Sequence, residues 1–288
     1  MSETISEDIK ALVDANTVHV DSVDAIPVET VEASLKRDSF ACITGLFSPA
    51  EIDAARAGLG QGFDAGRDNP SHGEAPGAVM DNFQKVAVGG AMQSWAYRPR
   101  FMRVIYNPVW ADDIYGMRAI FRRLAQVRNK LQGHAPDYAV DKVEDGLWTA
   151  ARIQHYPAGG GFLIPHRDTV TPTVTHDAGH TVYHQLLLLI TEKGRDFESG
   201  GGFVDVRGER IVFEDYLSRG AVVIYDGSTV HGVADIDPHK VPDMTGLSGR
   251  LVAFASLYKD MSGEKKLFED YDRSRADEGL VGGKGVAA

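Results

Sequence analysis

The chain of 288 residues is 43% hydrophobic and 25% charged, and it carries a formal net charge of -11 at pH 7. A globular protein of this length forms one large domain or about two small ones, and the negative charge argues against nucleic acid and anionic lipid as partners. No apolar run approaches the roughly 20 residues of a membrane-spanning helix, and the acidic N-terminus lacks the regions of a signal peptide, so we expect a cytoplasmic protein without membrane association.

The N-terminal part predicts a lead-in, a strand and a capped helix. Residues 1–25 are polar and predict an extended or helical segment, and residues 38–44 predict a short strand. The next segment, Ser-Pro-Ala-Glu at 48–51, supplies an N-cap, a proline in the first turn and a glutamate at the third helical position. We therefore expect a helix that runs to about Leu59.

Two further segments complete the first half of the chain. Residues 60–90 are rich in Gly, Asp, Asn and Pro and are too long for an ordinary connection, which predicts a functional loop or lid; a variable surface loop is the alternative. Between Trp110 and Leu131, apolar residues recur at three- and four-residue steps, which predicts an amphipathic helix that Gly133 ends. We interpret residues 1–145 as a helical support with a lid region.

After Gly146 the pattern changes to short strands separated by glycine-rich turns. Many short strands at regular spacing predict a double-sheet jelly roll, the architecture of cupins. The expected fold is thus α+β, mainly β, with a cupin-like core at 146–260 braced by the N-terminal helices, and with a C-terminal tail at 261–288, all in one domain. The six candidate strands are residues 150–156, 183–191, 202–207, 221–225, 230–236 and 250–258.

Three residues of this region form a candidate metal site. His166 and Asp168 are two positions apart, so on a strand both side chains point to one face and Arg167 points away. His231 lies 63 positions later (231 - 168) at the start of another candidate strand, and a jelly roll returns strands beside earlier ones. Two histidines and one carboxylate are the facial triad of non-haem Fe(II), which leaves open positions for a co-substrate and O2.

The tripeptide His-x-acid is not informative by itself. With 10 His and 41 acidic residues in 288 positions, chance alone gives about 1.4 such tripeptides (10 × 41/288). Three occur, beginning at His19, His72 and His166. The weight of the third therefore depends on the residues around it.

Those surroundings resemble a known family. Residues 152–168, which read Arg-Ile-Gln-His-Tyr-Pro-Ala-Gly-Gly-Gly-Phe-Leu-Ile-Pro-His-Arg-Asp, resemble the entry into the double-stranded β-helix of Fe(II)/2-oxoglutarate-dependent oxygenases, especially the prolyl-hydroxylase-like branch. There a tyrosine and a glycine turn precede the His-x-Asp strand. The resemblance spans about 150–258, and further blocks keep the family's order: residues 185–192 with 198–203, residues 220–226 with 231–233, and residues 248–254.

The resemblance implies a set of site residues. His166, Asp168 and His231 would bind the iron, and Arg250 would pair with the distal carboxylate of 2-oxoglutarate, for which a planar guanidinium is suited. Arg250 is 19 positions after His231 (250 - 231), because residues 238–249 form an extra loop. Arg152 is the reserve candidate for this role, and Tyr156 and Gln185 are candidates for further co-substrate contacts.

The resemblance also implies a reaction. Family members that install halide have a small residue in place of the carboxylate ligand, so Asp168 favours hydroxylation or a related oxidation such as desaturation, in which 2-oxoglutarate and O2 become succinate and CO2. We expect a small-molecule substrate, such as a free amino acid or a natural-product intermediate. The alternatives are a protein or peptide hydroxylase, a non-catalytic cupin-like binding module, and a zinc hydrolase. Association into a homo-oligomer is left open.

Other polar residues have two interpretations. A basic and amide-bearing group could recognise a carboxylate-bearing substrate, or it could be a solvated surface; it comprises Arg98, Arg100, Arg103, Asn82 and Gln84. Four histidines near the site in sequence could support the iron ligands, or they could be ordinary hydrogen-bonded side chains. They are His155, His176, His180 and His184.

Overall fold

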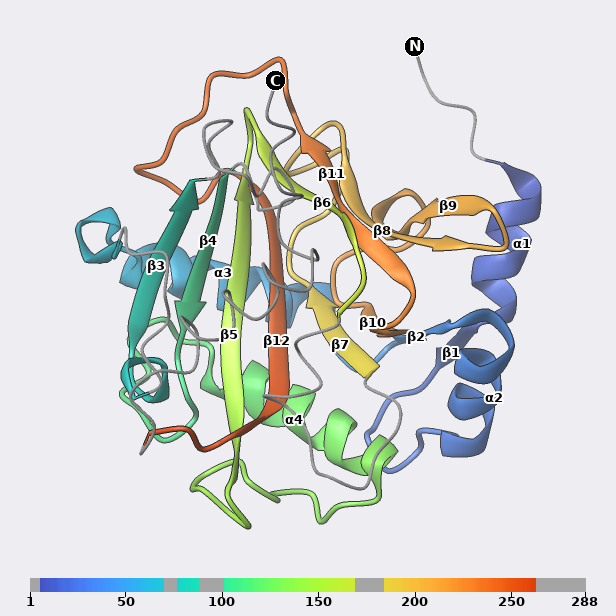
Figure 1. Cartoon of the computed structure of the whole chain (residues 1–288), viewed down its shortest axis with the longest axis horizontal. Coiled ribbons are helices and arrows are strands. Elements are labelled where there is room, and N and C mark those ends of the chain that lie inside the picture. The colour runs from blue at the N-terminus through green and yellow to red at the C-terminus, as the bar shows by residue number, and fades with distance from the viewer. Residues whose placement is uncertain (1–5, 70–76, 89–100, 169–183, 263–288) are drawn as a thin grey trace, which may run out of the picture.

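The computed structural model describes residues 6–69, 77–88, 101–168 and 184–262. Eight strands between Leu147 and Lys259 form two facing layers, with strand order β10-β7-β12-β5 in one and β6-β11-β8-β9 in the other (Figure 1). Apart from the hairpin β8–β9, the chain alternates between the layers as in a jelly roll, which confirms the predicted double-stranded β-helix core. These strands are β5 (Leu147–Pro157), β6 (Gly161–His166), β7 (His184–Leu189), β8 (Gly201–Val206), β9 (Glu209–Val212), β10 (Val222–Asp226), β11 (Val230–Ile236) and β12 (Gly249–Lys259).

Further strands extend the sheet on both sides. Beyond β10 lie β2 (Phe40–Thr44) and β1 (Thr17–His19), and beyond β5 lie β4 (Phe101–Tyr106) and β3 (Phe83–Val88). The N-terminal part is therefore not only helical, because three of these four strands were not predicted from the sequence. In particular, the expected loop or lid at 60–90 contains β3, which pairs antiparallel with β4.

The described residues contain four α-helices, α1 (Glu7–Ala15), α2 (Val28–Asp38), α3 (Pro49–Gly62) and α4 (Arg118–Gln132). At α3 the predicted capping box is present, since the Ser48 hydroxyl accepts from the Glu51 N–H and the Glu51 carboxylate accepts from the Ser48 N–H. At α4 the predicted end is also present, with Gly133 in the left-handed conformation at φ 73. However, α4 begins at Arg118 rather than near Trp110. No helix of the described residues is long and apolar enough to cross a membrane.

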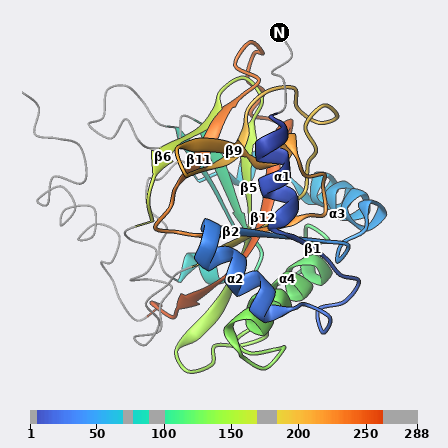
Figure 2. The same ribbon diagram turned by 90° about the vertical axis from the view of Figure 1, so that its right-hand side faces the viewer.

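The helices fix which side chains of the core strands point inward. Helices α2, α3 and α4 cover the outer face of the layer that contains β7 and β12 (Figures 1 and 2). Leu251 and Ala253 of β12 face these helices, whereas Val252 and Phe254 pack inside against the second layer. Because strand side chains alternate, Arg250 is placed on the inner face.

Candidate metal centre

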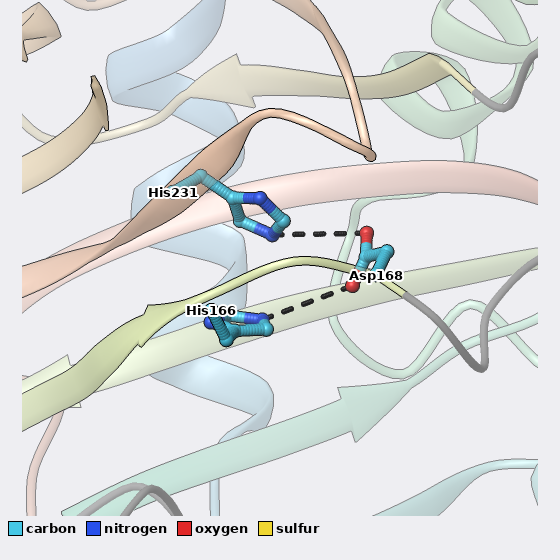
Figure 3. Close-up of side chains that lie close together, drawn as sticks. All are labelled: His166, Asp168 and His231. Carbon is cyan, nitrogen blue, oxygen red and sulfur yellow. Dashed lines mark ion pairs between the residues drawn. The ribbon is translucent and has the colours of Figure 1, made fainter. Parts of the chain in front are cut away.

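The side chains of His166, Asp168 and His231 meet at the layer formed by β6, β11, β8 and β9. His166 is the last residue of β6, His231 is the second residue of β11, and the two are register partners on adjacent strands. Asp168 lies two residues beyond β6 rather than on it, which corrects the expectation that His166 and Asp168 share one strand. All three side chains nevertheless point to one space, and their potential ligand atoms lie within 4.8 Å of one another (Figure 3).

Backbone carbonyls set the orientation of both imidazoles. His166 Nδ1 lies 2.8 Å from the Ile164 carbonyl oxygen, and His231 Nδ1 lies 2.9 Å from the Thr229 carbonyl oxygen. Because a carbonyl only accepts, Nδ1 carries the proton in the neutral form of each ring, and Nε2 then keeps its lone pair. The Nε2 atoms of both rings therefore face Asp168 in the form that binds a metal ion.

The carboxylate of Asp168 is held between the rings and Gln185. Its two oxygens lie 3.7 Å from His166 Nε2 and 3.7 Å from His231 Nε2. Gln185, at the start of β7, donates from Nε2 to Asp168 Oδ2 over 2.8 Å. Gln185, which was expected to contact the co-substrate, thus orients a candidate ligand, and among the described residues its own buried Oε1 has no hydrogen-bond partner.

The donor set fits a divalent iron. Burial is the largest effect on His231 and lowers its pKa, opposed by the nearby Asp168 carboxylate, so the ring is neutral at neutral pH. The Nε2–carboxylate separations of 3.7 Å are too long for hydrogen bonds. Ligands bound at about 2.1 Å at right angles lie about 3 Å apart, so small side-chain movements would close the three donors onto one ion.

A cavity of about 200 Å³ extends from the three side chains between the two layers. Its wall combines apolar side chains with a few buried polar ones, the usual character of a small-ligand site. The polar lining residues are Arg152, Gln154, Gln185, Arg250 and the tyrosines Tyr106, Tyr156, Tyr225 and Tyr258, in addition to His166, Asp168 and His231.

Arg250 lies in a socket of the cavity wall that Glu214, Gly202 and Tyr156 form. Its Nε donates to Glu214 Oε1 over 2.5 Å, and its guanidinium carbon is 5.6 Å from the centre of the Tyr156 ring. Glu214 also accepts from the Gly202 N–H over 2.8 Å. A Cβ at Gly202 would lie 2.3 Å from Arg250 Nη2, so any larger residue there would displace the guanidinium. Within the described residues, the hydrogen bonds of Arg250 come from Nε alone, which leaves the outer edge of the fork for a ligand.

Tyr156 forms one side of this socket. Burial raises the pKa of Tyr156 to about 12, so its phenol is neutral. The hydroxyl donates to Gln154 Oε1 over 3.0 Å, and both side chains line the cavity. Tyr156 therefore supports Arg250 with its ring.

Glu214 is a site residue that sequence reasoning missed. It lies in the short 3-10 turn η3 (Phe213–Asp215), its side chain is 1% exposed, and it forms a buried ion pair with Arg250. Its neighbour Asp215 is also acidic but pairs with Lys193. The sequence therefore showed two adjacent acids and gave no signal to tell them apart.

Several other candidates stabilise the fold instead. Arg103 is fully buried, forms a bidentate ion pair with Asp68 and donates to the Met244 carbonyl, so it belongs neither to the cavity nor to a basic surface. Gln84 donates to Asp68 as well. His155 accepts from Arg103, and Asn82 donates to the Asp112 carbonyl. His184 does not line the cavity. Arg98, Arg100, His176 and His180 lie outside the described residues.

Comparisons with known proteins give similarity in overall shape. No family model and no curated protein matches the chain. A putative 2OG-Fe(II) oxygenase family protein from Caulobacter crescentus has 18% identity over 92% of this chain and 99% of that chain, with a TM-score of 0.49. EctD from S. alaskensis in its apo form has 15% identity over 88% and 83%, with a TM-score of 0.49.

A Pseudomonas putida prolyl-4-hydroxylase has 13% identity over 81% of this chain and 98% of that chain, with a TM-score of 0.44.

Proposed function

We propose that this protein is an Fe(II)- and 2-oxoglutarate-dependent oxygenase that hydroxylates a small molecule. The observation that carries the proposal is the pairing, in one cavity, of a two-histidine, one-carboxylate cluster with a buried arginine. His166, Asp168 and His231 would hold the iron on one face and leave the opposite positions open. When bound, Fe(II), 2-oxoglutarate and O2 supply oxidation of a C–H bond with release of succinate and CO2.

The spacing between Arg250 and the cluster suits 2-oxoglutarate. The Arg250 guanidinium touches Gly202, which is the register partner of Val233. Val233 is two residues from His231 along β11, and two residues of strand measure about 7 Å. A five-carbon dicarboxylate has about this length, so Arg250 would bind its distal carboxylate while the other end reaches the metal.

The remaining residues orient these groups. Gln185 fixes the Asp168 carboxylate, and the two backbone carbonyls fix the imidazoles. Asp168 fills the position that a halide would need, which favours hydroxylation or desaturation over halogenation. The small volume of the cavity favours a small molecule over a protein segment as substrate.

The test is succinate formation by the full-length protein supplied with Fe(II), 2-oxoglutarate and a panel of metabolites and peptides. We expect turnover that requires O2 and that is lost in His166→Ala and His231→Ala. His19→Ala is the matched control, because His19 lies in a similar His-x-Asp tripeptide but far from the cavity lining. Consumption of a panel compound without O2 and without succinate formation would indicate hydrolysis, and succinate formation that survives both ligand variants would disprove the proposal.

A further inference from the structure

The cavity contains a second buried arginine that the co-substrate does not need. Arg152 is 4% exposed and Arg250 is 2% exposed, and both line the cavity. They lie at different levels of the sheet: Tyr156 is the register partner of Arg250, whereas Phe254 is the register partner of Arg152. A buried guanidinium in the wall of a binding cavity is suited to bind a carboxylate, because its planar fork can donate two parallel hydrogen bonds.

Arg152 is held firmly in the wall. Its guanidinium carbon lies 4.7 Å from the centre of the Phe254 ring and 5.1 Å from that of Tyr258. Its Nη1 donates to the Ala150 carbonyl over 3.2 Å and to the Ser256 hydroxyl over 3.0 Å. A guanidinium held in this way loses little conformational entropy when it binds an anion.

The register places Arg152 across the cavity from the metal cluster. Phe254, its partner, pairs in turn with Leu187 of β7, and Leu187 is two residues from Gln185, the residue that donates to Asp168. Arg152 on β5 and Gln185 on β7 are thus two strands apart, about 10 Å across the sheet, and two residues apart along the strands, about 7 Å. Arg250 lies four residues further along β12 (254 - 250).

We propose that Arg152 binds a carboxylate of the organic substrate, so that the substrate is a small anion held between Arg152 and the metal. This inference rests on the proposed function and names the substrate class. Tyr106 is the register partner of Arg152, and Tyr106, Phe254 and Tyr258 line the cavity near it, which suits an apolar or aromatic body. Because the whole chain carries a net charge of -11, a local buried cation is needed for an anionic substrate to bind.

The experiment distinguishes the proposed role of Arg152 in substrate binding from that of Arg250 in 2-oxoglutarate binding. The full-length protein is loaded with Fe(II) and 2-oxoglutarate and is given a panel of small carboxylic acids, including the free amino acids, each paired with its neutral carboxamide; phosphate esters form a second arm. We expect carboxylates to stimulate succinate formation, with their carboxamides at least about tenfold weaker. In Arg152→Gln, kcat/KM for the active acid should fall about 100-fold, and the preference over its carboxamide should disappear.

Binding of 2-oxoglutarate to the Mn(II)-loaded protein provides the independent readout. The Kd of 2-oxoglutarate should stay within about threefold of wild type in Arg152→Gln and should rise in Arg250→Gln. Arg152→Lys keeps the positive charge and should recover part of the lost activity, which a purely structural role would not predict.

Several results would overturn the inference. These are equal stimulation by acids and carboxamides, an unchanged preference in Arg152→Gln, activity with phosphate esters only, no active carboxylic acid in the panel, or loss of 2-oxoglutarate binding in Arg152→Gln. The last would make Arg152 the co-substrate anchor. A wild-type protein that binds no 2-oxoglutarate would instead refute the proposed function, so the two failures are distinguishable.

Discussion

At the residue scale, the contacts of Arg250 affect both the stability of the folded protein and the binding of 2-oxoglutarate. Arg250 and Glu214 are buried together, and an unpaired buried charge costs several kcal/mol. A bound dicarboxylate would bring a second anion to the same guanidinium. The charge of Glu214 thus stabilises the ligand-free protein and competes with the ligand.

Glu214→Gln should separate these two effects. The variant keeps the shape of the side chain but removes the charge, so the ligand-free protein should lose about 3–5 kcal/mol of unfolding free energy. Mn(II) with 2-oxoglutarate should then stabilise the variant more than it stabilises wild type, because the ligand supplies the missing anion. Urea unfolding with and without the ligand measures both quantities, and Glu209→Gln, an exposed acid of β9, is the control. Equal stabilisation of both proteins would contradict the expectation.

Gly202→Ala should disturb the socket through shape alone. The added Cβ would lie 2.3 Å from Arg250 Nη2, so the guanidinium must move. We expect 2-oxoglutarate to bind about tenfold more weakly, which corresponds to about 1.4 kcal/mol. Gly60→Ala is the matched control, because its Cβ would meet nothing within 4 Å, and it should leave the affinity unchanged. Titration of the Mn(II)-loaded variants with 2-oxoglutarate decides the matter; an unaltered Kd in Gly202→Ala would place the co-substrate elsewhere.

The sequence could predict the residues of the site better than their partners. His166, Asp168, His231 and Arg250 were all named from sequence blocks, because side-chain type and spacing are visible there. Glu214 was not, since its contact with Arg250 joins two segments 36 positions apart. Likewise, no sequence pattern shows that Asp168 lies beyond the strand and is held by Gln185.

At the element scale, local patterns predicted six of the eight core strands and missed most of the added ones. β6 was expected only as the strand that carries His166, without bounds, and β9 was not predicted. The candidate strand 230–236 coincides with β11, and the ends of the other five differ by at most three residues from the structure. By contrast, β3 follows a glycine- and proline-rich segment and is stabilised by pairing with β4, which is a tertiary effect. Trp110 was assigned to a helix, yet its ring packs on Trp148 and its Nε1 donates to the Met80 carbonyl, so tertiary contacts override its helical pattern.

The extra loop between β11 and β12 is held by a buried network. Arg103 donates to the Met244 and Gly246 carbonyls, and it also donates to His155 Nδ1. The His155 ring must then donate from Nε2 to the Ser248 carbonyl, 2.8 Å away, just before β12. The ring is neutral in this arrangement, and burial lowers the pKa of His155 to about 4.

This loop should therefore make the protein sensitive to acid. His155 has a folded-state pKa of about 4 against 6.5 for the ordinary side chain, so the unfolded state binds the proton more readily. Its contribution is fully present above pH 6.5 and is lost as the pH falls from 6.5 toward 4, by about 1.4 kcal/mol per pH unit. Urea unfolding across this range should show a shallower pH slope in His155→Gln than in wild type. Parallel slopes in the two proteins would contradict the assignment.

At the scale of the whole molecule, the site exists only when the jelly roll is closed. His166 and Asp168 are close in the chain, but His231 is 63 positions beyond Asp168 (231 - 168), and the β6–β11 register brings it to His166. The unfolded chain therefore offers no preformed three-donor site. A metal ion that binds the folded state alone must stabilise the whole protein.

Metal binding should accordingly raise the unfolding temperature. At a free Mn(II) concentration about 100 times its Kd, the gain is about 2.7 kcal/mol, and a chelator should reverse it. The double variant His166→Ala, His231→Ala should show no such gain, whereas His19→Ala should behave as wild type. 2-Oxoglutarate should add further stabilisation only when Mn(II) is present, because one end of the molecule needs the metal while Arg250 binds the other. Stabilisation by Mn(II) in the double variant would mean that the ion binds outside the cluster of His166, Asp168 and His231.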